Sequence, residues 1–327
     1  MKKLSAIGEA LIDFIPEQRG CALQEVEGFR RRCGGAPANV AAVCGKLEIP
    51  AQMIGCVGAD AFGGYICDVL QKAGVDTEHI SQTKAANTTL AFVSLKEDGD
   101  REFMFYRRPG ADMLLSEEDL CEEMFRDTGI LHFCSVGLVE GPSKYAHKKA
   151  IQLVSRNGGL ISFDPNIRLP LWESPSDCRD AVWEFLPSAD LLKISDEELE
   201  FITGKKDITE ALPELFAGRV KMVLYSKGKG GASLYTKTRN ITVVAPEVNV
   251  ADTTGAGDAM IGSFLACLIK DGIAPKDLER LPVEALLKYL EFSAYYASHS
   301  VTNKGAIEAY ADKNEITKFI KEYENKR

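Results

Sequence analysis

The sequence predicts an α/β fold built on a mostly parallel sheet, with a small second β-sheet beside it. After about residue 129, short apolar runs alternate with longer helical patterns, which is typical of parallel strands joined by right-handed crossovers. The N-terminal third instead carries short strand-like runs broken by turn signals. No linker divides the 327 residues, so we expect a single domain.

The N-terminal third mixes helical patterns with short strands. We expect helices over residues 36–47 and 61–73. The strand-like runs cover residues 23–32, 88–96 and 101–107, and the turn signal Glu97-Asp98-Gly99-Asp100 separates the last two. We expect these runs to pair in an antiparallel manner as a flap that covers a bound substrate and excludes water.

From residue 129 onward the alternation of strands and helices is regular. The expected strands are 130–135, 160–164, 191–195 and 220–226, and the expected helices include 143–157 and 196–203. Ligands bind at the carboxyl ends of parallel strands. Three polar groups stand at such ends, namely Asp164-Pro165-Asn166, Lys193 and Ser226, so we expect them to lie at one edge of the sheet.

The heptapeptide 252–258 (DTTGAGD), followed by an apolar run to Ile269, is the most informative stretch. A glycine turn at the start of a helix lets backbone N–H groups converge on an anion, and the helix start adds partial positive charge. The stretch therefore predicts a phosphate site. A carboxylate beside that phosphate would be repelled unless it acted on a neutral hydroxyl, so we interpret Asp258 as a proton acceptor. Helix capping alone also favours an aspartate here.

A second glycine motif covers residues 34–41 (GGAPANVA). Its two glycines allow close approach of a ligand, and the Asn39 amide can both donate to and accept from a hydroxyl group. The Asp13 carboxylate, earlier in the chain, can accept hydrogen bonds from two adjacent hydroxyls of a polyol. The structural alternatives are a tightly packed loop and a solvated strand-end acid.

The two motifs resemble the N- and C-terminal signatures of the ribokinase-like, or PfkB, carbohydrate kinases, at the expected separation. The resemblance implies one ribokinase-like kinase domain over residues 1–327, a three-layer α/β/α sandwich with a mostly parallel central sheet. It also implies a β lid contributed by about residues 14–33 and 87–110. It implies an anion hole for the transferred phosphate at Gly255, Ala256 and Gly257, a catalytic base at Asp258, and sugar contacts at Asp13, Gly34, Gly35, Asn39 and Asp258.

Arg168 lies in the run 164–168 (DPNIR), just past a predicted strand end. A guanidinium group at this place can clamp a phosphate in a bidentate manner. Fructokinases and related ketose kinases show a similar DPNxR run, so we predict a catalytic contact between Arg168 and the transferred phosphate. The alternative is a surface arginine on a proline-bounded loop.

The resemblance also implies a site for ATP. Residues 226–231 (SKGKGG) are similar to the glycine-containing loop that lies near the ATP phosphates in the family, although they lack Walker A spacing. Without the resemblance, the same run would be interpreted as a hairpin turn. The predicted nucleotide contacts are Lys193, Ser226, Lys227, Gly228, Gly231, Gly257 and Asn303.

Two cation sites follow from the resemblance. Family members often carry an Asn-x-x-Glu motif whose acid orders magnesium through water; here residues 195–198 read SDEE, so serine replaces the asparagine and Glu198 keeps the acid. A monovalent cation site, for potassium, is implied for Asp252, Thr254, Ser300, Asn303 and Gly305. Ala309 replaces a side-chain ligand that some relatives use.

The segment 103–115 is similar to the flap of fructokinases, in which FYR-x-P-x-ADMLL recurs. Arg107 is then expected at the flap edge, where it would bind the sugar or the transferring phosphate, and Phe105 would cover the sugar ring. This favours transfer of the γ-phosphoryl group of ATP to the 6-hydroxyl of D-fructose. A kinase for 2-keto-3-deoxygluconate or ribose is the alternative, and a catalytically silent sugar-binding or regulatory protein is an alternative from another class. The intact Asp258 argues against the last of these.

Composition disfavours two classes of partner, and the resemblance implies a small-molecule sugar and ATP as the partners. A net charge of -9 and a pI near 5.2 disfavour binding to nucleic acid or to anionic membranes, and the longest apolar window, residues 259–269, is too short to span a bilayer. Nine scattered cysteines without a C-x-x-C pair suit a reducing cytoplasm. Exposed lid edges such as residues 23–32 are candidates for a homodimer contact, and we interpret the run Arg30-Arg31-Arg32 as a solvated face.

Overall fold

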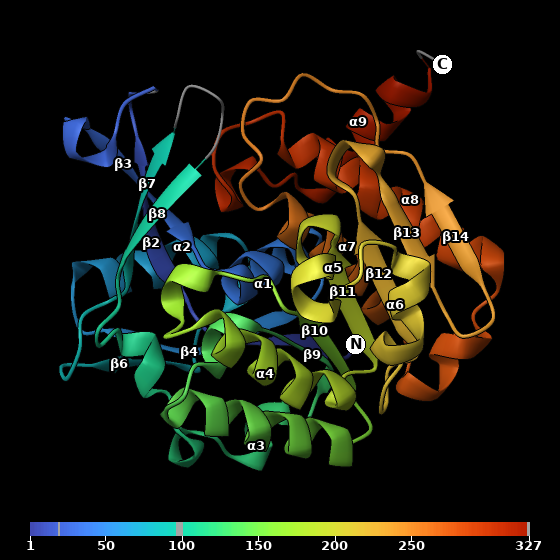
Figure 1. Ribbon diagram of the computed structural model, residues 1–327, viewed down its shortest axis with the longest axis horizontal. Helices are drawn as coiled ribbons and strands as arrows, with labels where there is room; N and C mark the ends of the chain where they lie inside the picture. The colour runs from blue at the N-terminus through green and yellow to red at the C-terminus, as the bar shows by residue number, and fades with distance from the viewer. Residues whose placement is uncertain (19, 96–100, 326–327) are drawn as a thin grey trace.

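The computed structural model describes residues 1–18, 20–95 and 101–325 (Figure 1), so the predicted turn at residues 97–100 lies outside the described residues. Its central sheet has the strand order β14-β13-β12-β11-β10-β9-β1-β4-β5, and β6 also pairs with β4. The strands are β1 (Lys3–Ile7), β4 (Ala51–Gly58), β5 (Val75–Asp76), β6 (Ile80–Thr83), β9 (Thr128–Cys134), β10 (Leu160–Asp164), β11 (Leu191–Ser195), β12 (Met222–Ser226), β13 (Ala232–Tyr235) and β14 (Asn240–Val243).

All pairings from β12 through β5 are parallel, whereas β13 and β14 extend the β12 edge in an antiparallel manner. The prediction of a mostly parallel central sheet is therefore confirmed. The expected strands of the second half of the chain agree with β9 to β12 to within two residues at each end.

Helices cover both faces of this sheet. They are α1 (Ala36–Lys46), α2 (Ala61–Lys72), α3 (Pro142–Arg156), α4 (Pro175–Phe185), α5 (Asp196–Thr203), α6 (Ile208–Leu215), α7 (Ala256–Lys270), α8 (Val283–Ser300) and α9 (Lys313–Glu324). Residues of α1, α2, α7, α8 and α9 form one apolar core, and residues of α3 to α6 form the other. Neighbouring strand residues alternate between the two: Leu191 belongs to the first core and Leu192 to the second. The three-layer prediction is confirmed.

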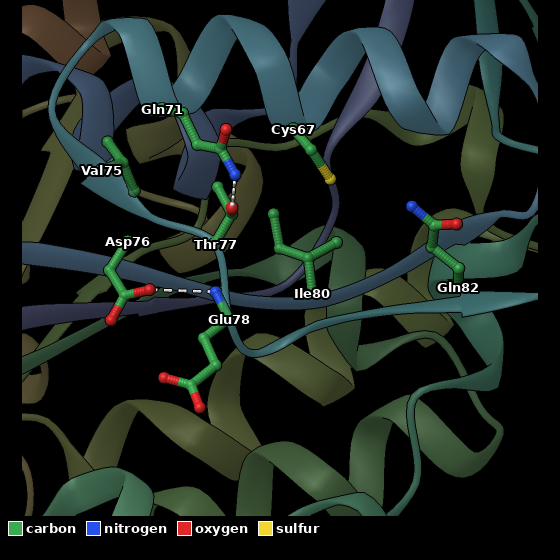
Figure 2. A pocket seen from close by; sticks show the side chains of 8 residues that line it. All are labelled: Cys67, Gln71, Val75, Asp76, Thr77, Glu78, Ile80 and Gln82. Atoms are coloured by element: carbon green, nitrogen blue, oxygen red, sulfur yellow. Dashed lines mark hydrogen bonds between the residues drawn. The ribbon is translucent and has the colours of Figure 1, made fainter.

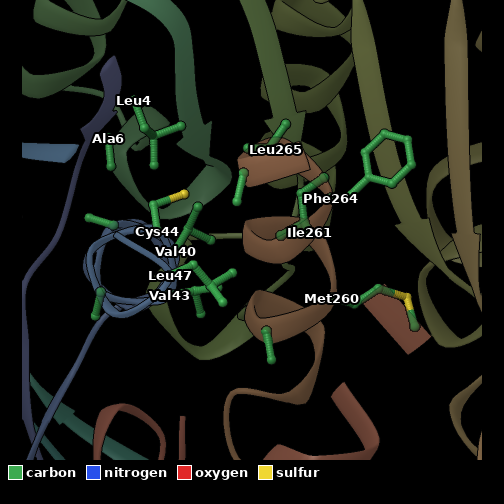
Figure 3. Close-up of a cluster of buried hydrophobic side chains, with 14 of the residues drawn as sticks. Leu4, Ala6, Val40, Val43, Cys44, Leu47, Met260, Ile261, Phe264 and Leu265 are labelled. Carbon is green, nitrogen blue, oxygen red and sulfur yellow. The ribbon is translucent and has the colours of Figure 1, made fainter. Parts of the chain in front are cut away.

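The crossing of α1 and α7 is the packing contact that matters most for the site. Figure 3 shows Val40, Val43 and Cys44 of α1 directed toward α7, and these side chains are fully buried, as are Ile261 and Phe264 of α7. A Cβ atom at Gly262 would lie 2.9 Å from Val43 Cβ, so only glycine lets the helices approach this closely. The contact fixes the N-terminal ends of α1 and α7 relative to each other.

A separate four-stranded sheet, the lid, lies at the upper left of Figure 1, in the order β3-β2-β7-β8. Its strands are β2 (Leu11–Pro16), β3 (Phe29–Gly34), β7 (Leu90–Leu95) and β8 (Arg101–Tyr106). The pair β7–β8 is antiparallel as expected. Strand β2, which was not predicted, pairs antiparallel with β3 and parallel with β7, so the wholly antiparallel prediction was wrong. The reason is topological: β2 and β7 are joined through α1, β4 and α2 rather than by a hairpin.

The predicted strand at residues 23–32 is divided in the structure. Residues 23–25 form a short 3₁₀ helix, η1 (Leu23–Glu25), and the strand begins only at Phe29. An aromatic cluster gives the lid its own packing: Phe14 stacks on Phe92 at 4.8 Å between ring centroids, and Phe14 also meets Phe62 of α2 edge to face at 5.8 Å. These contacts attach the lid to the body of the protein.

Candidate active site

Asp164 and Lys193 form a buried ion pair at the carboxyl edge of the central sheet. The parallel register pairs Phe163 of β10 with Leu192 of β11, so the next residues, Asp164 and Lys193, are neighbours, and Lys193 Nζ lies 3.0 Å from Asp164 Oδ2. Burial opposes the charge of Lys193, but Asp164, Glu198 and Asp258 together hold its pKa above the ordinary value. This edge of the central sheet therefore carries a lysine, Lys193, that is positively charged near neutral pH.

Asp258 lies in the first turn of α7, with only 8% of its surface exposed. Its Oδ2 atom accepts a hydrogen bond of 2.8 Å from Asn39 Nδ2, which α1 brings from the other side of the helix crossing. Burial raises the pKa of Asp258 above the ordinary value for an aspartate, and Asn39, Lys193 and Arg168 oppose that rise only in part. A carboxylate with a raised pKa is a stronger proton acceptor, as a general base requires.

The start of α1 is shaped by glycines, as the motif predicts. Gly35 caps the helix with φ 102°, and a Cβ atom there would lie 2.4 Å from the Glu9 carbonyl oxygen. A Cβ atom at Gly34 would lie 2.0 Å from Asp13 Oδ2, so the absence of a side chain at Gly34 makes room for that carboxylate. The structure thus gathers Asp13, Gly34, Gly35 and the start of α1.

Glu9 is a buried acid of this region that the sequence analysis did not select. Its Oε1 atom accepts a hydrogen bond of 3.2 Å from Ala36 N, and its Oε2 atom is buried without a hydrogen-bond partner among the described residues. Burial raises the pKa of Glu9 to about 7, against smaller opposing effects of its hydrogen bonds and of Arg107. The available signal was an acidic residue in an otherwise apolar run, residues 6–12.

The turn before α7 is the predicted anion hole, and its binding of a phosphate stays a prediction. Gly255 adopts a left-handed φ of 74°, and its carbonyl oxygen accepts a hydrogen bond of 3.0 Å from Tyr310 Oη. A Cβ atom at Gly257 would lie 3.4 Å from Lys193 Nζ, so the buried cation faces the helix start. Ala256 N donates to Thr253 O within the turn, at 3.3 Å. The helix dipole and Lys193 act on the same point, which suits a phosphate.

Arg168 is half-buried beyond the end of β10. Its Nη1 atom donates to the carbonyl oxygen of Ile167 at 2.9 Å, and its charge contributes to lowering the pKa of Asp258. The guanidinium group is therefore within electrostatic reach of the proposed base. A direct contact with a phosphate stays a prediction.

Glu198 connects two loops of the site. Its Oε1 atom accepts from Ile167 N at 2.8 Å, and its Oε2 atom accepts from Ser195 N at 2.9 Å and Ser195 Oγ at 2.8 Å. Burial raises the pKa of Glu198, but Lys193 and these donors outweigh it and lower the net value. Ser195, which replaces the asparagine of the family motif, thus caps α5 together with Glu198.

The described residues hold no group of three histidine, cysteine or acidic side chains that could bind a metal ion by themselves. The Oε1 atom of Glu198 accepts only one hydrogen bond and so has a free lone pair in a buried setting, which fits a magnesium ion held mainly by phosphate oxygens and water, with Glu198 beyond the water. The predicted role of Glu198 is compatible with this donor set.

The loop 226–231 joins β12 to β13 as a hairpin, in which Lys227 N donates to Gly231 O at 2.9 Å. The Lys227 ammonium group donates to Ser233 Oγ at 3.0 Å. The hairpin interpretation thus describes the local structure, and the nucleotide contacts of Ser226, Lys227, Gly228 and Gly231 stay predictions.

Part of the predicted monovalent cation site is gathered around Asp252. Its Oδ1 atom accepts from Thr254 N and Thr254 Oγ1, and its Oδ2 atom accepts from Gly305 N at 3.0 Å. The other two side chains are directed elsewhere: Ser300 Oγ is buried and donates to Ala297 O, and the exposed Asn303 donates to Thr302 Oγ1. Cation ligation by residues 300 and 303 stays a prediction.

Arg107 directly follows lid strand β8 and its side chain is buried, and its contact with the sugar or the transferring phosphate stays a prediction. The side chain is 4% exposed; its Nη2 atom lies 2.7 Å from Asp112 Oδ2 and donates to Val136 O at 3.0 Å. Strand β8 ends at Tyr106, and the chain then enters the short helix η2 (Ala111–Leu114), where Asp112 supplies a buried counter-charge. Phe105 stays half-buried within β8.

A surface pocket of about 470 Å³ lies between the C-terminal half of α2 and strands β5 and β6 (Figure 2). In it, Gln71 Nε2 donates to Thr77 Oγ1 at 2.7 Å. Strand β5 pairs with the first residues of β4, so this part of the pocket faces the amino edge of the sheet, away from the group around Asp258. We assign it no role in the site.

The chain matches known proteins along almost its entire length. The model of the pfkB family of carbohydrate kinases matches residues 1–313. A probable fructokinase-2 of Arabidopsis thaliana is 40% identical, over 97% of this chain and 95% of that protein. The structure of a fructokinase from Xylella fastidiosa with bound ATP is similar with a TM-score of 0.92 and 32% identity, and covers 99% of this chain and 100% of that one. The structure of a putative ribokinase II from E. coli in complex with ATP and magnesium is similar with a TM-score of 0.87 and 29% identity, and covers 98% of this chain and 100% of that one. Together with the glycine motifs around Asn39 and Asp258, these matches show that the chain belongs to the pfkB family of carbohydrate kinases.

Proposed function

We propose that this chain is an ATP-dependent fructokinase that transfers the γ-phosphoryl group of ATP to the 6-hydroxyl of D-fructose. The observation that carries the proposal is the position of Asp258, which meets Asn39 of the sugar-side motif and shares the start of α7 with the phosphate turn. The fructokinase relatives at about 40% identity support the choice of sugar.

On the sugar side, Asp13 and Asn39 offer the carboxylate and amide groups that bind adjacent hydroxyls. The absence of side chains at Gly34 and Gly35 makes room for the Asp13 carboxylate and for the backbone of Glu9. Phe105 would cover the ring from the lid, and Arg107 would act from its buried pair with Asp112.

On the nucleotide side, the γ-phosphate would lie at the turn 255–257, opposite Lys193 and within reach of Arg168. The loop 226–231 and Asn303 would hold the rest of ATP. Magnesium, when bound, neutralises charge on the nucleotide phosphates, and Glu198 would order its water ligands.

Catalysis would consist mainly of positioning and charge stabilisation. Asp258 accepts the proton of the 6-hydroxyl while the oxygen of that hydroxyl forms a bond to the γ-phosphorus. The bond between that phosphorus and the β–γ bridging oxygen breaks, and ADP leaves with the electron pair. The N–H groups of the α7 start, together with Lys193 and Arg168, hold the negative charge that develops on the transferring group.

Three further features belong to the proposal. Potassium would bind near Asp252, Thr254 and Gly305, supported by the hydrogen bonds that gather these residues. A homodimer would form through the lid, whose edge strand β8 exposes Met104 and Tyr106. A location in the cytoplasm is supported by nine cysteines that are all free. Within the described chain, no helix combines the length and apolar character needed to cross a membrane.

A sugar panel tests the proposal. ADP release is measured with fructose, ribose, 2-keto-3-deoxygluconate, mannose and nucleosides, and the phosphorylated position of the product is determined. We expect the highest kcat/KM with fructose and phosphorylation at the 6-position. A preference for ribose, consistent with the ribokinase II neighbour, would replace fructose in the proposal, and no release with any sugar would favour the silent binding protein.

A further inference from the structure

The three consecutive arginines of the lid strand β3 have different surroundings: Arg30 and Arg31 are exposed, as expected for a solvated face, whereas Arg32 is half-buried. Arg30 forms an exposed ion pair with Glu17, with side chains 72% and 52% exposed. Arg31 stacks over the ring of Tyr65 on α2 at 4.2 Å. Arg32 lies 3.3 Å from Glu308, with side chains 29% and 30% exposed. This third pair joins positions 276 residues apart in the chain.

Arg32 stands beside the sugar-side acid. The register of the antiparallel pair β2–β3 places Arg32 directly opposite Asp13. Residues directly opposite in such a pair point to the same face, with Cβ atoms about 4.5–5.5 Å apart. Gly34, two residues further along β3, makes room for the Asp13 carboxylate. Arg32 therefore flanks the place where we put the sugar hydroxyls.

Glu308 stands in the segment that supports the phosphate turn. It belongs to the short helix η10 (Ile307–Ala309), and Gly305, just before that helix, donates its N–H to Asp252 Oδ2. Just after the helix, Tyr310 donates to the Gly255 carbonyl oxygen. A Cβ atom at Gly255 would lie 2.8 Å from Ala306 Cβ, so the segment 305–310 packs directly against the turn before α7.

We propose that Arg32 and Glu308 are positioning residues that couple the sugar side of the site to its nucleotide side. Their ion pair fixes the strand that flanks Asp13 to the segment that holds the Gly255 turn. A sugar that orders the lid strand then also orders the phosphate turn, and by thermodynamic linkage a bound nucleotide strengthens sugar binding by the same factor. The inference rests on the proposed function, because it takes Asp13 as a sugar ligand and the Gly255 turn as a phosphate site.

The coupling has a bounded size. Ion pairs with partly exposed side chains contribute about 0.2–1 kcal/mol, which corresponds to a factor of about 1.4 to 5 in affinity. The test compares fructose dissociation constants of the full-length protein by calorimetry, without nucleotide and with saturating MgADP, which does not support phosphoryl transfer. The variants are R32Q, E308Q and the double variant, and R30Q is the matched control from the same arginine run.

We expect MgADP to tighten fructose binding in the unchanged protein, and R32Q and E308Q each to reduce this tightening by about 1.4- to 5-fold. The double variant should lose no more than either single variant, since both remove the same pair. R30Q should behave like the unchanged protein. E308Q keeps the side-chain shape and lies away from Asp13, so it tests the pair even where R32Q disturbs the lid.

Tightening that E308Q leaves intact, effects of the two single variants that add in the double variant, or an equal effect of R30Q would each overturn the inference. The sugar panel separates this outcome from failure of the proposed function. A chain that prefers ribose is tested by the same cycle with ribose as the titrated sugar.

Discussion

Removal of the Asn39 amide should shift the pH dependence of catalysis in a direction that the structure fixes. Asn39 Nδ2 donates to Asp258 Oδ2 at 2.8 Å and stabilises the ionised form of this buried carboxylate. In Asn39→Ala the carboxylate keeps its burial and the charges of Lys193 and Arg168 but loses this donor. Its pKa, already above the ordinary value, should rise further.

The size of the shift follows from the type of hydrogen bond. A hydrogen bond to a charged group contributes about 1.5–3 kcal/mol, and about 1.4 kcal/mol corresponds to one pKa unit. The pKa of Asp258 should therefore rise by about one to two units in Asn39→Ala. A general base works only when ionised, so the acid limb of the plot of kcat against pH should move to higher pH by the same amount.

The assay measures kcat at saturating fructose and ATP between about pH 5 and 9, with the sugar phosphate quantified directly so that no coupling enzyme adds its own pH dependence. Saturation removes the effect of weaker sugar binding, which loss of Asn39 would also cause. At the alkaline end both proteins hold an ionised Asp258, so their kcat values should converge. Asn157→Ala, at the exposed C-terminal end of α3, is the matched control. An acid limb that stays in place, or a kcat reduced by the same factor at every pH, would refute the reasoning.

Two other substitutions test the sugar side and its buried acid. In Gly34→Ala the new methyl group meets the Asp13 carboxylate, so the fructose KM should rise at least about tenfold while the ATP KM stays within about twofold. The control is Gly64→Ala, where a Cβ atom meets nothing within 4 Å, and it should change neither KM. Glu9→Gln keeps an acceptor for Ala36 N but does not titrate. Because the folded-state pKa of Glu9 is raised to about 7, ionising Glu9 costs stability as the pH rises toward and through that value. Between pH 5 and 8, the free energy of unfolding of the variant, measured with urea, should therefore gain about 1–3 kcal/mol relative to that of the unchanged protein. A difference in the free energy of unfolding that is the same at pH 5 and pH 8 would contradict the argument that burial raises the pKa of Glu9.

Much of the fold was predictable because its signals are local. Each strand and helix of the second half carries its own apolar period and turn residues, and a regular alternation of the two implies a parallel sheet. The glycine motifs were predictable for the same reason, since the turn at Gly255 and the cap at Gly35 need backbone conformations that few other residues adopt.

The side-chain partners were not predictable, because they depend on register between distant strands. The pair of Asp164 and Lys193 exists because β10 and β11 align Phe163 with Leu192. In the same way, the burial of Arg107 depends on where η2 places Asp112, and a sequence pattern cannot distinguish a buried pair from an exposed edge. The parallel pairing of β2 with β7 depends on the long connection between them.

The central claim is that Asp258 is the catalytic base, and Asp258→Asn tests it most directly. The asparagine keeps the size of the side chain and an oxygen that can accept from Asn39 Nδ2, so folding and sugar binding should survive. The measurement is kcat with fructose and ATP at neutral pH, together with the fructose dissociation constant. We predict that kcat falls by about 10²- to 10⁴-fold while the dissociation constant stays within about threefold. A kcat close to that of the unchanged protein, in a variant that binds fructose normally, would contradict the claim.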